Sequence, residues 1–148
     1  MKVKAIGMIY SPFKSKKDAP IQPLKSKAKG KVVLFEEYIE GLDGIDGFSH
    51  IYLIYKFHKS KGYKLKVIPF LDDKPKGLFA TRAPRRPNQI GISVVKLIKI
   101  KKNILFVEGI DVLDGTPLLD IKPYIPDFEL KGKVKIGWLE GKIKKWRS

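Results

Sequence analysis

The sequence predicts an all-β fold: a small closed or nearly closed β-barrel of mostly antiparallel strands, with long functional loops and little helix. Apolar and polar residues alternate through several short stretches, which is the period of a strand that buries one face. Turn residues separate these stretches, and only residues 36–42 have a helical pattern, of about two turns. Because closure removes exposed strand edges, many short strands with little helix favour a barrel.

The first half of the chain contains four predicted strands, at residues 3–9, 31–36, 50–57 and 64–70. The third is apolar at nearly every position, which predicts burial of both of its faces. The fourth alternates cleanly until Pro69. Because proline cannot donate to a strand ladder, this pattern predicts an edge strand or a strand end.

The second half contains three further predicted strands, at residues 92–100, 104–113 and 133–138. The first two flank the turn residues 101–103 and therefore predict a hairpin. Three long stretches, 11–30, 71–91 and 114–127, lack periodicity and are rich in proline, glycine or lysine. Long irregular segments inside a compact domain are usually functional or disordered, so we expect functional loops here.

The length and composition indicate one globular domain without a membrane segment. We expect a single barrel domain over residues 1–148, with a basic tail at 139–148, because 148 residues suffice for one core. No apolar run approaches the roughly 20 residues that span a bilayer, and no signal-peptide pattern is present, so we expect a cytoplasmic protein. With no cysteine and two histidines, the sequence argues against disulfides, thiolate nucleophiles and a metal site.

The strongest compositional feature is a net charge of +16, from 31 basic and 15 acidic residues. Such a field attracts polyanions, so nucleic acid is the first partner class that it predicts and an anionic membrane surface the second. Lysine greatly outnumbers arginine, however, and many lysines alternate with apolar residues. A lysine-rich solvated surface without a polyanionic partner is therefore the third interpretation.

The loop at residues 79–91 carries three arginines between prolines, and it is the chain's most concentrated set of binding side chains. Guanidinium forks bind carboxylates and phosphates with two parallel hydrogen bonds, and Pro84 and Pro87 stiffen the backbone that presents them. Asn88 has the hydrogen-bonding groups to read a purine edge. The charge pattern alone fits a basic surface loop equally well, just as Asp114-Gly-Thr-Pro117 is first of all a turn.

Five motifs, in this order along the chain, together resemble the TrmO family, also called TsaA-like. The motifs are Ile6-Gly-Met-Ile-Tyr-Ser-Pro-Phe13, Ala19-Pro-Ile-Gln22, Gly47-Phe-Ser-His-Ile-Tyr-Leu-Ile54 with Phe57-His58, Gly77-Leu-Phe-Ala-Thr-Arg-Ala-Pro-Arg-Arg-Pro-Asn-Gln-Ile-Gly91, and Asp111-Val-Leu-Asp-Gly-Thr-Pro-Leu-Leu-Asp-Ile-Lys-Pro-Tyr-Ile-Pro126. The resemblance implies a small β-barrel, a homodimer with the methyl donor near the subunit interface, and an S-adenosylmethionine-dependent tRNA (adenine-N6)-methyltransferase. The implied substrate is N6 of threonylcarbamoyladenosine next to the anticodon.

The resemblance also implies which residues serve the reaction. The expected S-adenosylmethionine contacts are Pro20, Ile21, Gln22, His58, Lys59, Arg82, Ile92, Val112, Leu113, Asp114 and Gly115. The expected RNA contacts are Arg85, Arg86 and Asn88, with the two arginines directed at the RNA backbone or at the threonyl carboxylate. Arg82 is expected to act in catalysis by holding the donor carboxylate or an RNA phosphate. Asp114 either meets a cationic group or acts as base.

Two departures from the family pattern leave alternatives open. Ile21 stands where family members usually carry arginine, so a contact made by that side chain is lost while a backbone contact survives. The chain also ends soon after the expected barrel, which is typical of a short form without a further C-terminal domain. A noncatalytic RNA-binding barrel, or a methyltransferase on another RNA or a small molecule, therefore remains an alternative.

Overall fold

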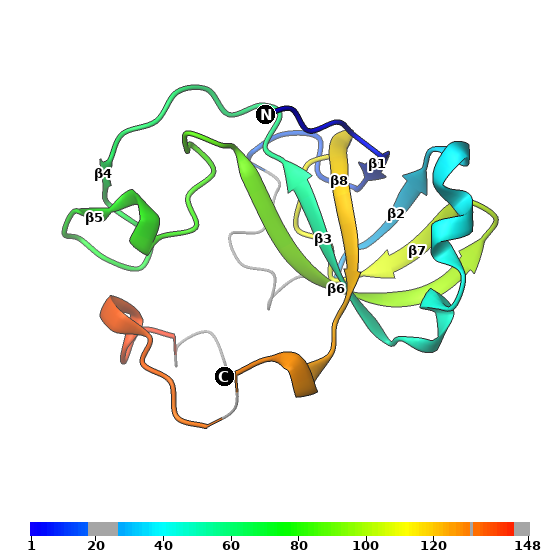
Figure 1. Ribbon diagram of the computed structural model, residues 1–148. Coiled ribbons are helices and arrows are strands. Elements are labelled where there is room, and N and C mark those ends of the chain that lie inside the picture. The colour runs from blue at the N-terminus through cyan, green and yellow to red at the C-terminus, as the bar shows by residue number, and fades with distance from the viewer. Residues whose placement is uncertain (18–26, 131, 144–148) are drawn as a thin grey trace.

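A closed barrel of six antiparallel strands forms the centre of the protein (Figure 1). The computed structural model describes residues 1–17, 27–130 and 132–143. Neighbouring strands around the barrel are β1 (Gly7–Tyr10), β2 (Lys29–Leu34), β7 (Ile104–Glu108), β6 (Ile90–Lys101), β3 (His50–Lys56) and β8 (Thr116–Pro123), and β8 pairs with β1 to close the ring. The predicted all-β barrel with little helix is confirmed, because the helices of the described residues are short 3-10 turns.

The barrel interior is packed by the alternate positions that the sequence pattern marks as apolar. Along β6, the inward residues Gly91, Ser93, Val95 and Leu97 are buried, whereas the residues between them are exposed. The fully enclosed core also takes Ile9, Val32, Ile51, Leu53, Leu105, Val107, Ile110 and Leu118 from the other strands and from the segment after β7. Burial of this apolar set supplies the main driving force for closure.

The closing strand lies where the sequence predicts a loop, and the predicted last strand is wrong. β8 occupies part of the 114–127 stretch, and its two prolines lie near its ends, opposite Met8 and Ile51. Residues 133–138 form no strand; they are mainly exposed and lead into η6 (Gly137–Leu139). Because β8 already joins β1 to β3, the closed barrel offers no edge to a further strand.

Two other expectations for single strands need correction. β3 buries its inward residues completely, but its outward Tyr52 and Ile54 are only half-buried, so the prediction of two buried faces is wrong. Of residues 64–70, only β4 (Lys66–Val67) is a strand, paired with β5 (Lys76–Gly77) outside the barrel. The predicted helical turns at 36–42 are present as η2 (Glu36–Leu42), which η3 (Ile45–Gly47) follows.

The C-terminal segment packs against the β4–β5 region beside the barrel (Figure 1). The Trp138 indole N–H donates at 2.8 Å to the carbonyl of Ala80, the last residue of η4 (Leu78–Ala80). Asp72 accepts from Lys142 at 2.9 Å and from Lys76 at 3.0 Å, and both lysines hold the pKa of its carboxyl well below the usual range. These contacts fix the start of the 81–88 loop.

The strand directions define two ends of the barrel. β8 begins at Thr116, beside the end of β1, the end of β3 and the beginning of β6; we call this the Thr116 end. β8 finishes at Pro123, beside the beginning of β3, and η2 and η3 lie at this Pro123 end. Within the described residues, no helix is long and apolar enough to cross a membrane.

Candidate functional site

The predicted site residues that the structure describes gather at or near the Thr116 end of the barrel. They come from the segment after β3, the 81–88 loop, the beginning of β6 and the turn before β8. Pro20, Ile21 and Gln22 lie outside the described residues. The strands therefore bring together motifs that are up to about a hundred residues apart in sequence, as the contact between Ser11 and Asp114 illustrates.

The turn before β8 is anchored to the end of β1. The Asp114 and Gly115 amides donate to the carbonyls of Phe13 and Ile9 at 2.7 and 2.8 Å. The Thr116 hydroxyl donates to the Leu113 carbonyl at 2.6 Å, and Gly115 has a left-handed φ of 78° that favours glycine. The turn is thus a fixed element that presents the Asp114 carboxylate in one direction.

Both oxygens of the Asp114 carboxylate already have partners. Oδ1 accepts the Ser11 amide at 2.9 Å, and Oδ2 accepts the Lys14 ammonium at 2.7 Å. Lys14, followed by the Ser11 amide, holds the pKa of the Asp114 carboxyl below its usual range. A low pKa keeps this group anionic and makes it a weak proton acceptor. The geometry therefore suits Asp114 to meeting a cation better than to acting as base.

His58 and Lys59 follow β3 and lie near the same turn. The His58 Nδ1 is 3.5 Å from the Thr116 hydroxyl, and Lys59 is close enough to Asp114 to contribute to the low pKa of that carboxyl. Burial, followed by the nearby Lys59 and Lys56, lowers the pKa of His58. His58 is therefore mainly neutral at pH 7. Because the Thr116 hydroxyl donates its proton to the Leu113 carbonyl, the His58 Nδ1–H points to the Thr116 oxygen and Nε2 remains as an acceptor for a ligand.

The three arginines of the 81–88 loop differ in their environment. Arg82 and Arg85 are exposed, whereas Arg86 is half-buried and its Nη1 donates to the Thr81 and Ala83 carbonyls at 2.9 and 3.0 Å. The positive charge of Arg82 acts on the hydroxyls of Tyr52 and Tyr55, so its guanidinium lies near these two residues of β3. Arg86 therefore stabilises the conformation of the loop, and the exposed Arg82 guanidinium is available to contact a ligand.

A buried hydrogen-bonded chain at this end was not predicted from the sequence. The Tyr55 hydroxyl is 2.8 Å from the Ser93 Oγ, and the Ser93 hydroxyl donates to Asp111 Oδ1 at 2.6 Å. Because Ser93 uses its one proton on Asp111, Tyr55 must donate to Ser93. Burial raises the pKa of the Asp111 carboxyl and of the Tyr55 hydroxyl. The one sign of this hydrogen-bonded chain in the sequence is Ser93, a serine at an inward position of the otherwise apolar strand β6.

Gly91 leaves the space that this chain needs. A Cβ at this position would lie 2.5 Å from the Tyr55 ring and 2.6 Å from the Phe57 ring. We expect Gly91→Ala to lower the free energy of unfolding by about 1–3 kcal/mol, because the two packed rings must move. Urea unfolding measures this change. Gly47→Ala, where a Cβ meets nothing within 4 Å, is the matched control, and an equal loss in both variants would contradict the packing argument.

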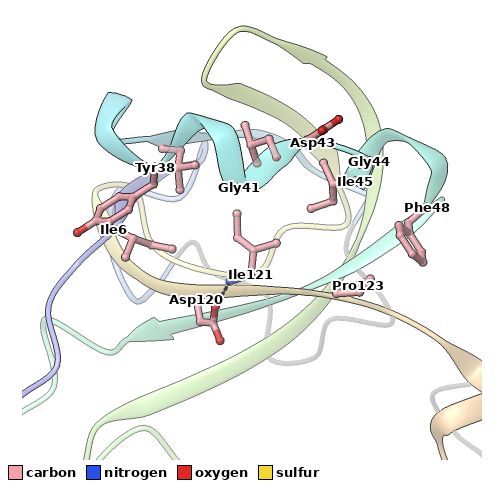
Figure 2. Close-up of a pocket in the computed structure, with 12 residues that line it drawn as sticks. Ile6, Tyr38, Gly41, Asp43, Gly44, Ile45, Phe48, Asp120, Ile121 and Pro123 are labelled. Carbon is pink, nitrogen blue, oxygen red and sulfur yellow. Dashed lines mark hydrogen bonds between the residues drawn. The ribbon is translucent and has the colours of Figure 1, made fainter.

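A cavity of about 380 Å³ lies at the other end of the barrel (Figure 2). Side chains of η2, η3 and the second half of β8 line it, among them Tyr38, Leu42, Ile45 and Ile121. None of the predicted site residues that the structure describes lines this cavity. The site is thus an open surface of converging loops at the Thr116 end, where Ile92 is 43% exposed and Val112 is buried beneath the turn.

Comparison with known proteins identifies the family. Residues 8–130 match the family described as the tRNA-methyltransferase O N-terminal domain. The chain belongs to this family. The resemblance carried by the five motifs is therefore confirmed, and the TrmO-type barrel is the fold on which the site is built.

Three relatives illustrate how the TrmO N-terminal domain occurs in other proteins. A Pyrococcus abyssi protein named as a probable S-adenosyl-L-methionine-binding protein is 54% identical over 143 residues, which cover 96% of this chain and 78% of that protein. A mouse tRNA (adenine(37)-N6)-methyltransferase is 39% identical over 132 residues, 84% of this chain and 31% of the mouse protein. The crystal structure of TrmO from Pseudomonas aeruginosa superposes with a TM-score of 0.79 at 38% identity, covering 93% of this chain and 61% of the solved chain.

Proposed function

We propose that this protein binds S-adenosyl-L-methionine at the Thr116 end of the barrel and transfers its methyl group to tRNA. The acceptor in this proposal is N6 of threonylcarbamoyladenosine at position 37, the position named for the mouse relative. The observation that carries the proposal is the convergence of the anchored Asp114 turn, His58, Lys59 and Arg82 at one end of the barrel. Family membership and the name of the Pyrococcus relative support the choice of donor.

The chemistry of the donor matches the charges at this site. S-adenosylmethionine carries a carboxylate, an ammonium group, a sulfonium centre and an adenine ring. Arg82 binds the carboxylate with its exposed guanidinium fork, and Asp114 meets a cationic group of the donor. The neutral His58 has its Nε2 available to accept a hydrogen bond from the adenine amino group or a ribose hydroxyl. Ile92 supplies an exposed apolar surface next to them.

The RNA contacts in this proposal come from the basic loop and from the overall charge. Arg85 and Asn88 are exposed and project from the 81–88 loop, where Arg86 fixes the backbone and leaves fewer of its own donors for RNA. The net charge of +16 steers tRNA toward this surface and makes binding depend on salt. Tyr52, whose hydroxyl feels the charge of Arg82, packs edge to face against Tyr124 at 5.5 Å and offers aromatic surface on the outward face of β3.

Two measurements on the whole chain test this function. Calorimetric titration with S-adenosylmethionine asks whether the donor binds, and a labelled methyl donor asks whether tRNA with or without the threonylcarbamoyl group accepts the methyl. Binding with transfer only to the modified tRNA supports the proposal. Salt-dependent tRNA binding without donor affinity identifies the noncatalytic RNA-binding alternative that Ile21 suggested. Transfer to another RNA or a small molecule identifies the substrate alternative.

A homodimer is the assembly that we propose for this site. The outward face of β6 exposes a row of large apolar side chains, at Ile90, Ile92, Val94 and Ile98, which are 36–47% exposed. Such a row on a sheet face marks an interaction surface, and Ile92 connects it to the donor site. We expect light scattering to give the mass of two chains, and Val94→Asp with Ile98→Asp to give the mass of one. If the wild-type protein has the mass of one chain, the proposed homodimer is wrong.

A further inference from the structure

Two carboxylates lie three residues apart at the Thr116 end, and their hydrogen bonds differ. Asp114 has both oxygens engaged, Oδ1 by the Ser11 amide and Oδ2 by the Lys14 ammonium. The Asp111 carboxylate accepts the Ser93 hydroxyl at Oδ1 at 2.6 Å and a further hydrogen bond from its own backbone amide, and no side chain of the described residues bonds to its Oδ2. Of these two carboxylates, only Asp111 therefore has an oxygen that no other side chain engages, and no cation is paired with it among the described residues.

The surroundings of Asp111 hold its side chain toward the site. Its neighbours Ile110 and Val112 are buried, and the Val112 carbonyl accepts the Ser11 hydroxyl at 2.6 Å, which fixes the backbone on one side. On the other side, the hydroxyl of Ser93 fixes Oδ1. Ser93 is only 2% exposed, and its oxygen is also bonded to Tyr55. Asp111 is partly exposed, and both it and Arg82 act electrostatically on the Tyr55 hydroxyl, so the Asp111 carboxylate lies in the same part of the molecule as Arg82.

We infer that Asp111 is the proton acceptor of the methyl transfer, with Ser93 and Tyr55 as the positioning residues that aim its Oδ2 at the acceptor nitrogen. This inference rests on the proposed function. The N6 lone pair forms a bond to the donor methyl carbon while the carbon–sulfur bond breaks, and its electron pair converts the sulfonium to a thioether. The N6 proton passes to Asp111 Oδ2, which becomes a neutral carboxylic acid and later releases the proton to water.

The acid–base properties of the two carboxyls agree with this division of roles. Burial raises the pKa of Asp111, which makes its carboxylate a better proton acceptor, whereas Lys14 and the Ser11 amide lower the pKa of Asp114. Environments that separate two nearby carboxyls in this way are a common means of assigning one as base and the other as a fixed charge. Tyr55 is the ionisable group that Ser93 links to Asp111 by hydrogen bonds. The charge of Arg82 also acts on the Tyr55 hydroxyl.

The decisive variant is Asp111→Asn, which keeps the acceptor for Ser93 and removes the proton-accepting oxygen. We expect the single-turnover rate of methyl transfer to fall by about 10²–10⁴-fold, the usual contribution of a positioned base, while the calorimetric affinity for S-adenosylmethionine stays within about threefold. Asp120→Asn at the other end of the barrel is the matched control, since its carboxylate bonds to the exposed Lys122.

The pH profile separates a base from a residue that only supports the fold. The Ser93 hydroxyl stabilises the ionised Asp111, so Ser93→Ala raises the pKa of Asp111 further and moves the acid limb of the rate profile to higher pH. In Asp111→Asn this limb disappears. Ser93→Ala provides the same test if the asparagine variant fails to fold.

If the wild type transfers the methyl group and Asp111→Asn does so equally fast, the role of Asp111 is overturned and the proposed function stands. The same holds if the pH–rate profile of Ser93→Ala coincides with that of the wild type. Equal loss of rate and donor affinity in a folded Asp111→Asn variant assigns Asp111 to donor binding and also overturns it. A wild-type protein that methylates no tRNA overturns the proposed function and this inference together.

Discussion

Replacing Arg82 with alanine is expected to reduce donor affinity and kcat/KM by about 10–150-fold, the effect of losing a hydrogen bond of about 1.5–3 kcal/mol to a charged group. Arg82 is exposed, and its guanidinium forms no hydrogen bond with another described residue. The free energy of unfolding should therefore stay within about 0.5 kcal/mol of the wild type. Calorimetry with S-adenosylmethionine, single-turnover transfer and urea unfolding measure the three quantities.

The other two arginines of the loop are controls for this result. Arg86→Ala removes the donors to the Thr81 and Ala83 carbonyls, so it should loosen the loop and affect donor and tRNA together. Arg85→Ala removes an exposed charge and should weaken tRNA binding while donor affinity is unchanged. Donor affinity in Arg82→Ala equal to that of the wild type would show that another group holds the donor carboxylate.

The barrel could be predicted from the sequence because each strand buries only one face. In β6, for example, buried and exposed residues alternate along most of the strand. The closing strand β8 was missed because Pro117 and Pro123 normally interrupt a ladder. Here, both lie near the ends of the strand. Residues 133–138 alternate as well as a true strand does, but the closed barrel has no free edge to pair with them. Alternation indicates that a segment fits a strand, and only the closed topology decides whether a partner exists.

The site was predicted in part, for a related physical reason. Residues that contact a ligand tend to lie in loops, where unusual sequences such as the three arginines stand out. Tyr55, Ser93 and Asp111 come from two strands and one loop, and become neighbours only through the pairing of β3 with β6 and the return of the chain after β7. Their types give no shared motif, and the role that we propose for them depends on distances that one sequence does not encode directly.

Asp114→Asn should weaken donor binding about tenfold while the barrel stays as stable as the wild type to within about 1 kcal/mol, because the ion pair that it loses is exposed on the Lys14 side. The asparagine Oδ1 still accepts the Ser11 amide, so the turn keeps its anchor. Asp114→Ala removes that acceptor too, and should cost about 1–3 kcal/mol of unfolding free energy for the part-buried amide left unpaired. Comparing the two variants separates charge from anchoring, and Asp46→Asn in the exposed η3 turn is the control.

Lys14 gives this prediction a pH dependence that can be tested. Its ammonium and the Ser11 amide lower the pKa of Asp114, so the carboxylate remains ionised, and its contribution to donor affinity remains constant, from neutral pH to below the usual aspartate value near 4. The stability that the ionised Asp114 contributes is likewise present above that value and is lost as the pH falls through its lower folded pKa. In Lys14→Ala the pKa of Asp114 rises, so on acidification the donor affinity declines at a higher pH than in the wild type.

At neutral pH the same Lys14→Ala variant should bind the donor more tightly, because Lys14 no longer competes for the Oδ2 of Asp114. Weaker binding in Lys14→Ala at neutral pH would mean that Lys14 contacts the donor itself and that Asp114 serves mainly to hold Lys14 in place.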